Sequence, residues 1–313
     1  MEQADLIWHN GELVAWEDAK IHVLTHGLHY GTSVFEGERC YETPRGPAIF
    51  RHQDHLARLM KSARLYYMPI PYTVQELRAA THELISANGL RECYIRPIAF
   101  RGYGQMGINP LECEVSVSIA VWPWGAYLGE AAKLEGVRAK VSSWRRISGD
   151  SLIPHAKAGG QYLNSVLAKI EATKGGYAES ILLDNRGFVC EGSGENIYVV
   201  QDGEVITPPQ TASILDGISR KSILTIARDL GYPVVERDLA RAELTLADEV
   251  FVSGTAAELV ALSEIDDQMI GEGGTGPVTR ELQRVFEDAL RGREPRYAEW
   301  LDVVDVPARA AAT

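Results

Sequence analysis

A lysine flanked by small residues is a candidate nucleophile in this sequence. Lys157 lies in residues 153–160, where alanines and glycines surround it, and a helical pattern begins just after them. A primary amine can form a covalent imine with a carbonyl compound and can carry a proton. Most lysines are solvated surface residues, so this segment alone does not assign a role.

Three later segments place polar groups and glycines where a ligand could approach the backbone. Residues 191–198 combine two glycines with two carboxylates ahead of a strand pattern. Residues 215–220 run into a helix, whose first N–H groups and the Ser219 hydroxyl could hold a phosphate. Residues 253–258 offer hydroxyl and N–H groups where a strand ends. Taken singly, each also fits a structural interpretation as a glycine-rich turn, a capped helix or a strand end.

Together these segments resemble the signature of class IV (fold type IV) pyridoxal 5'-phosphate aminotransferases. The pattern consists of Glu191, Ser193, Asn196-Ile197-Tyr198, Ile206-Thr207, Leu215, Gly217-Ile218 and Arg220. Further segments resemble branched-chain amino acid aminotransferases within that class, namely residues 29–37, 94–97, 123–127, 156–162 and 254–258. The resemblance covers about residues 7–301. It implies an α+β fold with a small N-terminal α/β domain and a larger C-terminal domain with a β-barrel-like core.

The resemblance implies a role for each of these residues around the cofactor. Lys157 would hold pyridoxal 5'-phosphate covalently and then move the proton between the amino acid Cα and the cofactor. Glu191 would keep the pyridine nitrogen protonated, and Tyr162 would hydrogen-bond the phenolic oxygen. The phosphate would be held by four residues: Arg58, Ile218 through its N–H, Ser219 and Thr255. The family more often has Thr at position 219, but Ser keeps the hydroxyl. Without the resemblance, the spacing around Arg58 favours an ordinary exposed helix residue.

The implied reaction exchanges the amino group of L-leucine, L-isoleucine or L-valine with 2-oxoglutarate, giving branched-chain 2-oxo acids and L-glutamate. One pocket must therefore accept both apolar side chains and a distal carboxylate, and the resemblance assigns the carboxylate to Arg96. The α-carboxylate would meet Tyr94 and the N–H groups around Ala256 and Ala257. The apolar lining is assigned to Phe35, Trp124 and Tyr127, with Tyr30 from a neighbouring subunit. Large aromatic residues are also common in cores, which is the alternative for Trp124.

One residue departs from the family pattern. Glu38 stands where an apolar residue is common. Strand alternation predicts that its side chain points away from the face of Gly37, toward Arg39 or solvent. A carboxylate near the pocket could instead alter the range of substrates.

The elements that position these residues can be read from turn and periodicity signals. Asn10-Gly11 predicts a hairpin near the start, and Thr73 with Glu76 forms a capping box for a helix that ends near residue 88. A helix is also expected over residues 53–67, and strands over 94–100, 114–122 and 137–144. Further helices are expected over 161–173, 219–230 and 278–290. Breakers and aromatics after residue 122 indicate an interdomain connection, so the predicted divisions are 1–122, 123–135 and 136–313, with a frayed alanine-rich tail over 307–313.

Composition excludes several other classes of protein. The chain has 313 residues, 45% of them hydrophobic, and a net charge of -12, which disfavours binding to nucleic acid or to an anionic membrane. The four cysteines are widely spaced, so neither a metal site nor a disulfide framework is indicated. No targeting segment is evident, which predicts a cytoplasmic protein. We expect amino acids and 2-oxo acids as its partners and a homodimer unit, with a higher homo-oligomer possible.

Two alternative functions follow from the same motifs. One is another activity on this scaffold, such as a D-amino acid or (R)-amine aminotransferase or an aminodeoxychorismate lyase, and Tyr94, Arg96 and residues 254–257 argue against it. The other is a non-catalytic protein that binds pyridoxal 5'-phosphate, which the presence of Lys157 and Glu191 disfavours.

Overall fold

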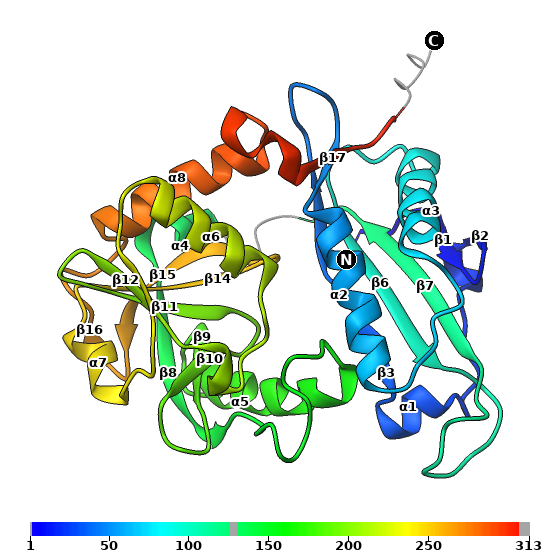
Figure 1. The fold of residues 1–313 in the computed structure, drawn as a ribbon, viewed down its shortest axis with the longest axis horizontal. Helices are drawn as coiled ribbons and strands as arrows, with labels where there is room; N and C mark the ends of the chain where they lie inside the picture. The colour runs from blue at the N-terminus through cyan, green and yellow to red at the C-terminus, as the bar shows by residue number, and fades with distance from the viewer. Residues whose placement is uncertain (1, 125–129, 307–313) are drawn as a thin grey trace. The chain divides into compact units, whose positions relative to one another are not determined.

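The computed structural model describes residues 2–124 and 130–306 (Figure 1). The chain folds into two compact units. The N-terminal unit comprises Met1–Trp124, Ala156–Gly160 and Asp288–Thr313, and the C-terminal unit comprises Gly125–His155 and Gln161–Glu287. This division differs from the predicted one, because two later segments join the N-terminal unit and because α4 (Glu130–Glu135) replaces part of the expected connection. Tyr127 and the tail over residues 307–313 lie outside the described residues.

The N-terminal unit is an eight-stranded antiparallel sheet with helices. The strand order is β17-β5-β4-β6-β7-β1-β2, and β3 pairs with β6. Helices α2 and α3 pack on each other and on this sheet (Figure 1). The strands are β1 Leu6–His9, β2 Glu12–Ala15, β3 Ser33–Phe35, β4 Glu38–Tyr41, β5 Ala48–Phe50, β6 Cys93–Arg101, β7 Val115–Trp122 and β17 Leu301–Val303. The helices are η1 Trp16–Asp18, α1 His26–Tyr30, α2 His52–Leu65, α3 Val74–Ala87 and η4 Pro295–Trp300.

Local sequence signals explain much of this unit. Asn10 and Gly11 both adopt positive φ at the turn of the β1–β2 hairpin, which confirms that prediction. The Thr73 side chain accepts a hydrogen bond from the Glu76 N–H, and Glu76 caps the Thr73 N–H in return, so the predicted capping box is present. The helix expected over residues 53–67 ends earlier, at Leu65.

The C-terminal unit has a nine-stranded mixed sheet. Its order is β10-β9-β8-β15-β14-β11-β12-β13, with β16 paired to β15. The strands are β8 Val137–Arg145, β9 Glu179–Leu183, β10 Val189–Gly192, β11 Asn196–Gln201, β12 Glu204–Thr207, β13 Val234–Glu236, β14 Glu249–Gly254, β15 Glu258–Ile265 and β16 Gln268–Met269. With α4 the helices are α5 Tyr162–Lys174, η3 Gln210–Ala212, α6 Ile218–Asp229, α7 Arg241–Leu246 and α8 Pro277–Leu290. The short helix η2 Gly159–Gln161 lies where the chain passes from the N-terminal unit to the C-terminal unit.

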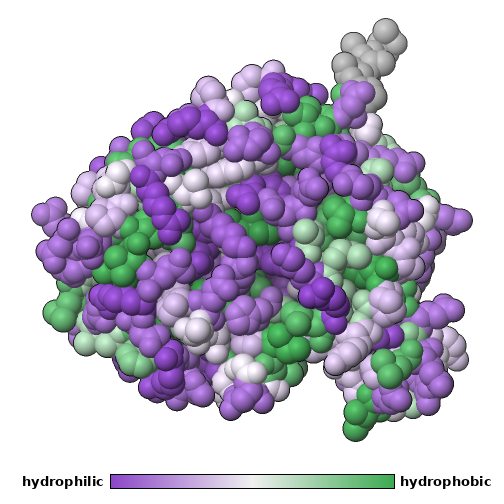
Figure 2. Space-filling model, in the orientation of Figure 1, coloured by the Kyte–Doolittle hydropathy of each residue, from purple (hydrophilic) through white to green (hydrophobic). Residues whose placement is uncertain are grey.

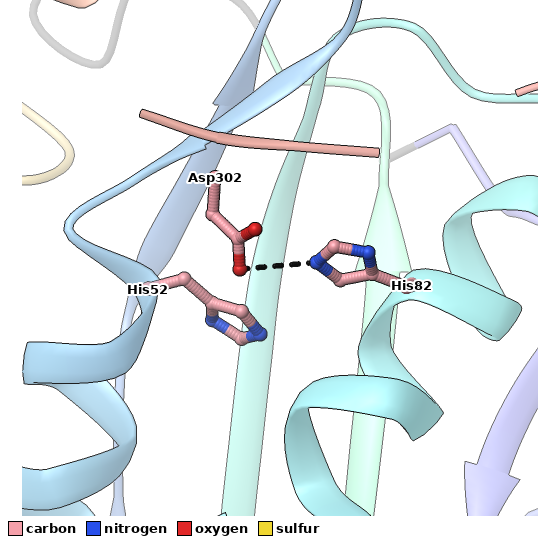
Figure 3. Close-up of side chains that lie close together, drawn as sticks. All are labelled: His52, His82 and Asp302. Atoms are coloured by element: carbon pink, nitrogen blue, oxygen red, sulfur yellow. Dashed lines mark hydrogen bonds and ion pairs between the residues drawn. The ribbon is translucent and has the colours of Figure 1, made fainter. Parts of the chain in front are cut away.

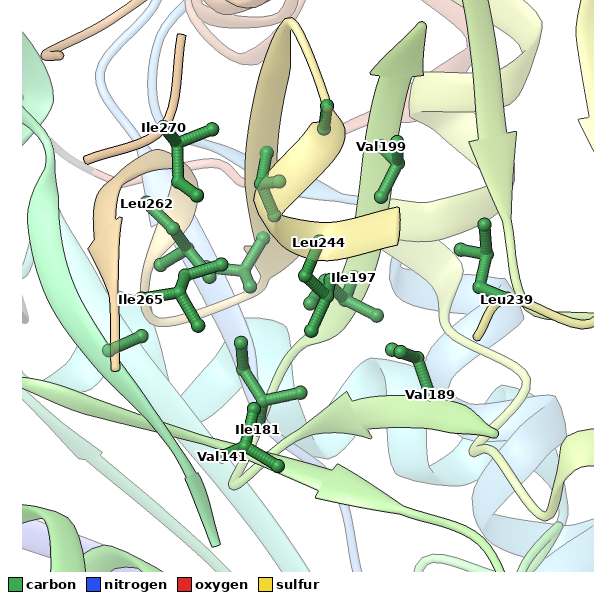
Figure 4. Close-up of a cluster of buried hydrophobic side chains, with 14 of the residues drawn as sticks. Val141, Ile181, Val189, Ile197, Val199, Leu239, Leu244, Leu262, Ile265 and Ile270 are labelled. Carbon is green, nitrogen blue, oxygen red and sulfur yellow. The ribbon is translucent and has the colours of Figure 1, made fainter. Parts of the chain in front are cut away.

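One apolar cluster forms the core of this second sheet (Figure 4). It takes side chains from strands β8 to β12, β14 and β15 and from α7, including Ile181, Ile197, Leu244 and Leu262. The strand order leaves β10 and β13 as edges, so the sheet forms an open half-barrel around the cluster. The expectation of a barrel-like core is therefore met by a partly closed sheet.

The surface drawn in Figure 2 is largely hydrophilic. Hydrophilic side chains predominate on the face drawn in Figure 2, and hydrophobic side chains gather in patches between them. Among the described helices, none combines the length and apolar character needed to cross a lipid bilayer.

Candidate active site

Strand β3 and helix α2 hold the backbone of Lys157. The Lys157 N–H donates to Ser62 Oγ at 3.0 Å, and the Lys157 carbonyl accepts from the Phe35 N–H at 3.0 Å. Ala158 also bridges to Val34. These contacts explain why residues 156–160 belong to the N-terminal unit although their chain neighbours do not.

The side chain of Lys157 lies on an aromatic face. Its Nζ is 5.0 Å from the centre of the Phe35 ring, and the residue is half-buried. This environment differs from the fully solvated position that a typical lysine occupies. The small neighbours also have a physical reason, since a Cβ on Gly31, which has a φ of +67°, would lie 2.8 Å from the Gly160 Cα.

Arg58 is held by a buried carboxylate instead of extending into solvent. Its Nε and Nη2 donate to the two Glu36 oxygens at 2.7 and 2.8 Å, and His55 Nδ1 lies 2.7 Å from the same carboxylate. Burial by itself would raise the pKa of Glu36, but the charge and hydrogen bonds of Arg58 and the hydrogen bond from His55 lower it well below its usual range. The two parallel hydrogen bonds fix the plane of the guanidinium. Glu36 and His55 were not singled out from sequence, although His55 lies on the same helix three residues before Arg58.

Aromatic rings surround the guanidinium of Arg96. Its Cζ is 4.9 Å from the Phe35 ring centre, 5.2 Å from that of Tyr94 and 5.9 Å from that of Trp122. Its Nη2 donates to Tyr94 Oη at 3.3 Å, while its buried Nε has no hydrogen-bond partner among the described residues. No carboxylate among residues 2–124 and 130–306 forms an ion pair with Arg96. This arginine can therefore receive a carboxylate from a ligand.

The remaining predicted pocket residues of the N-terminal unit lie in two places. Trp124 packs against Tyr94, with ring centres 5.1 Å apart, so it extends the aromatic group around Arg96. Tyr30 is 47% exposed on α1 and packs against His26. Trp122 belongs to the same aromatic group as Trp124 but was not among the predicted site residues.

In the C-terminal unit, three groups hold the buried Glu191 carboxylate. Arg146 Nε lies 2.8 Å from Oε1, although not with the geometry of a hydrogen bond. The Leu215 N–H donates to Oε2 at 3.0 Å, and Asn196 Nδ2 lies 3.3 Å from the same oxygen. The side chains of Glu191 and Arg146 are only 7% and 8% exposed. Sequence alone missed Arg146 because the pair joins β10 to the end of β8, 45 residues earlier in the chain.

The N-terminus of α6 offers donors to an anion. Gly217 caps this 12-residue helix, Ile218 and Ser219 follow it, and both are buried. The first N–H groups of a helix have no partner within it, and the helix dipole favours a negative charge there. Gly217 is required by a close approach, since a Cβ there would lie 2.0 Å from Asn196 Oδ1.

The other predicted residues of this unit lie at element ends. Thr255, Ala256 and Ala257 form the turn between β14 and β15, and Tyr162 is the half-buried first residue of α5. These positions agree with the predicted elements, while the roles assigned to the residues stay predictions.

Another buried carboxylate, that of Glu195, lies close to Glu191. Burial raises the pKa of Glu195 to about 8, and the charges of Glu179 and Glu191 add to the rise. Glu179 is itself paired to Lys169, with Nζ 2.6 Å from its oxygen. Near neutral pH, Glu195 therefore keeps its proton in the folded protein.

This raised pKa predicts a pH-dependent stability. Between the ordinary pKa of 4.5 and the folded value of about 8, the folded chain binds one proton more than the unfolded chain. The free energy of unfolding should therefore fall as pH rises through that window. Above the window, the stabilisation that the bound proton of Glu195 gives to the folded chain should be fully lost. Glu195→Gln mimics the neutral acid, so it should be more stable than the wild type at about pH 9 by roughly 1 kcal/mol or more, and nearly equal at about pH 5.

Urea unfolding at both pH values measures the difference. The exposed Glu272 supplies a matched control, since Glu272→Gln removes a carboxylate from the surface. If the free energy of unfolding depends on pH in the same way in Glu195→Gln and in the wild type, the raised pKa of Glu195 is contradicted.

Comparison with known proteins decides the family. The family model for amino-transferase class IV matches residues 33–265. The branched-chain-amino-acid aminotransferase of Escherichia coli (strain K12) is 48% identical over 305 residues, covering 97% of this chain and 99% of the relative. This chain belongs to the class IV aminotransferases.

Solved structures of the family have the same fold. The crystal structure of the Escherichia coli branched-chain amino acid aminotransferase matches with a TM-score of 0.95 at 48% identity, covering 97% of this chain and all of the other. The branched-chain aminotransferase of the thermophilic archaeon Thermoproteus uzoniensis with norvaline matches with a TM-score of 0.92 at 42% identity, covering 96% and 100%. The enzyme of Thermobaculum terrenum in its pyridoxal 5'-phosphate form gives a TM-score of 0.92 at 35% identity, covering 98% and 100%. The predicted α+β class of fold type IV is confirmed.

Within this family fold, each unit brings together part of the predicted site. The N-terminal unit gathers Lys157 and Arg96 on the Phe35 ring, with Tyr94 and Trp124 beside Arg96. The C-terminal unit gathers Glu191, Leu215 and Asn196, and Asn196 in turn lies against the Gly217 cap of α6.

Proposed function

We propose that this protein is a branched-chain amino acid aminotransferase. It exchanges the amino group of L-leucine, L-isoleucine or L-valine with 2-oxoglutarate, giving branched-chain 2-oxo acids and L-glutamate. The observation that carries this proposal is that the Lys157 amine and the Arg96 guanidinium lie 5.0 and 4.9 Å from the same Phe35 ring. A group that can transfer a proton and a group that can receive a carboxylate thus lie beside the same aromatic ring.

The cofactor of the proposed reaction is pyridoxal 5'-phosphate, and the donor set fits it. Lys157 provides the amine for a covalent link, and the buried Glu191 carboxylate suits a protonated ring nitrogen. Ser219 and the start of α6 suit the phosphate, together with Arg58, Ile218 and Thr255. Tyr162 would hydrogen-bond the phenolic oxygen. When bound, the group supplies a conjugated ring that accepts the electron pair left at the amino acid Cα.

In this proposal, Lys157 moves the proton. With the cofactor bound, the Lys157 Nζ would take the proton from the Cα of the amino acid and would release it again later in the same half-reaction. Hydrogen bonds to Ser62 and Phe35 fix the backbone from which this side chain extends, and the amine lies 5.0 Å from the centre of the Phe35 ring. A well-positioned general base of this kind contributes about 10²–10⁴-fold to the rate.

The group around Arg96 also suggests how one site accepts both apolar and acidic substrates. The rings of Phe35, Tyr94 and Trp122 present their faces to the guanidinium, and a cation on an aromatic face is partly stabilised without a counter-ion. With leucine bound, Arg96 therefore keeps a favourable environment. With glutamate bound, its donors can receive the distal carboxylate. The α-carboxylate would meet Tyr94 and the N–H groups of Ala256 and Ala257.

Replacement of Arg96 should separate the two half-reactions. In Arg96→Gln, kcat/KM for L-glutamate should fall about 10–100-fold, because a hydrogen bond to a charged group contributes about 1.5–3 kcal/mol. The value for L-leucine should change much less, since leucine offers no carboxylate to this side chain. Single-turnover rates with each amino acid measure the two effects. Arg45→Gln, which changes an exposed arginine, is the control. Equal losses for both substrates would contradict this role for Arg96.

The remaining features of the proposal concern assembly and location. We propose a homodimer unit in which Tyr30 serves the partner's site, supported by the exposed apolar residues Ile21, Val23, Leu24 and Leu28 beside it. A cytoplasmic location agrees with four free, buried cysteines. Amino acids and 2-oxo acids are the expected partners, and the acidic net charge of -12 argues against nucleic acid or membrane.

The choice of amino donor tests the proposed function against other activities of this fold. Purified protein with the cofactor and 2-oxoglutarate should form L-glutamate from L-leucine, L-isoleucine and L-valine. D-Alanine and (R)-1-phenylethylamine should react far more slowly. A faster reaction with D-alanine would replace the proposal with a D-amino acid aminotransferase.

A further inference from the structure

Two histidines and an aspartate meet in the N-terminal unit, away from the residues assigned to transamination. His52 begins α2, His82 lies on α3 and Asp302 lies on β17 (Figure 3). One ligand atom from each lies within 4.8 Å of the others. The two imidazole rings face each other with their centres 5.9 Å apart. Two imidazoles and a carboxylate are a donor set typical of zinc and related divalent ions.

The buried ring of His52 has a nitrogen that the protein leaves unpaired. Its side chain is 0% exposed, and its Nδ1 lies 2.5 Å from Glu38 Oε2. Its Nε2 is buried without a hydrogen-bond partner among the described residues. A ring that donates its Nδ1–H to the Glu38 carboxylate is left with a lone pair on Nε2, which is the atom that could bind a metal ion. A buried nitrogen without a partner destabilises the fold, so the atom is available to a ligand.

Glu38 takes the place that an outer carboxylate occupies in many metal sites. A histidine that binds a metal commonly donates its other ring N–H to a carboxylate, which fixes the ring and the tautomer. Glu38 makes this contact and is itself fully buried. The expectation that its side chain points toward Arg39 or solvent is therefore wrong, because the start of α2 covers it.

Asp302 pairs with two neighbouring side chains, His82 and Arg78. His82 Nε2 lies 3.1 Å from Oδ2, and Arg78 donates to both oxygens at 2.5 and 2.7 Å. A carboxylate has about four lone-pair sites, so the ion pair with Arg78 leaves room for a metal.

We propose that His52 Nε2, His82 Nε2 and Asp302 form a binding site for a divalent transition-metal ion such as Zn²⁺. Zinc ligands lie about 2.0–2.2 Å from the ion, so the half-buried His82 and Asp302 would close by about 1 Å. His52 and Asp302 also line a cavity of about 600 Å³, which gives water access to a fourth ligand position. The ion would join β17 to helices α2 and α3. The expectation of no metal site rested on the spacing of the cysteines, which this cluster does not use.

Zinc binding to the cofactor-loaded protein, prepared without a histidine tag, tests the proposal. Competition with a colorimetric chelator at neutral pH should give one Zn²⁺ per chain in this site. Loss of a residue that only orients a ligand weakens metal affinity by roughly 10–100-fold, and loss of a ligand itself should weaken it more. We therefore expect His82→Gln to lower the affinity for Zn²⁺ by at least about 100-fold. Glu38→Gln should lose about 10–100-fold. Zn²⁺ should raise the thermal unfolding midpoint of the wild type but not that of His82→Gln.

Two control variants separate a metal site from a plain ion-pair network. Arg78→Gln removes the other partner of Asp302, and its 41% exposed side chain makes this a mild change. It should keep zinc binding, as should His22→Gln, which replaces an exposed histidine elsewhere. Transamination should continue in His82→Gln, because the site lies outside the catalytic residues. The proposal is overturned if the wild type binds no zinc, if His82→Gln binds it as tightly, or if Arg78→Gln loses it to the same extent.

Discussion

Lys157→Ala should abolish transamination, with a fall in turnover of at least about 10⁴-fold. If Lys157 has the proposed roles, the variant loses both the covalent link to the cofactor and the base that moves the Cα proton, and a general base alone contributes up to about 10⁴-fold. The fold should survive, because Lys157 is anchored through its backbone to Ser62 and Phe35 and its half-buried side chain lies on the surface of one ring. Steady-state formation of L-glutamate from L-leucine measures the loss.

A matched control distinguishes the role of Lys157 from a general effect of removing a lysine. Lys174→Ala changes an exposed lysine at the end of α5 and should keep full activity. Lys157→Ala should also lose the visible absorption of the lysine-linked cofactor while its circular dichroism spectrum stays unchanged. Residual turnover within tenfold of the wild type would show that another residue carries the proton.

Glu191→Gln should lower kcat about 100-fold or more, which is the second largest effect that we expect. The neutral amide cannot keep a ring nitrogen protonated, and removing one preorganised electrostatic contact typically costs about 10²–10³-fold. The structure adds a second consequence, because the substitution leaves the buried Arg146 without its carboxylate. Breaking a buried ion pair on one side costs about 3–5 kcal/mol, so stability should fall as well.

A double variant separates these two effects. In Glu191→Gln with Arg146→Met, no buried charge remains unpaired at this position, so the free energy of unfolding should recover most of its loss. Turnover should stay low, because the carboxylate is still missing. Activity that recovers together with stability would mean that Glu191 acts only through the fold.

Local signals in the sequence predicted most of the elements. Asn10-Gly11 and the Thr73–Glu76 capping box act within a few residues, so they specify a turn and a helix start wherever the rest of the chain lies. The alternation of β7 likewise identified its buried face, including Val117, Ile119 and Val121. For the site, the family resemblance predicted roles for Lys157, Arg96 and Glu191, and these roles stay predictions, although the surroundings of the three residues fit the proposed chemistry.

Partners that meet only in the folded chain could not be predicted in this way. Arg146 reaches Glu191 from another strand, and His52 reaches Glu38 from the start of a helix. Strand alternation predicted the direction of the Glu38 side chain, but it could not predict that a helix covers this side chain. The division into units failed for the same reason, because β-pairing places residues 156–160 and the C-terminal strand with the N-terminal unit.

A titration in one cuvette tests the central claim most directly. The purified protein loaded with pyridoxal 5'-phosphate should absorb visible light through its link to Lys157. Addition of L-leucine alone should bleach that band, and 2-oxoglutarate should then restore it, which shows both half-reactions in sequence. A band that persists with L-leucine, or that 2-oxoglutarate fails to restore, would contradict the proposed function.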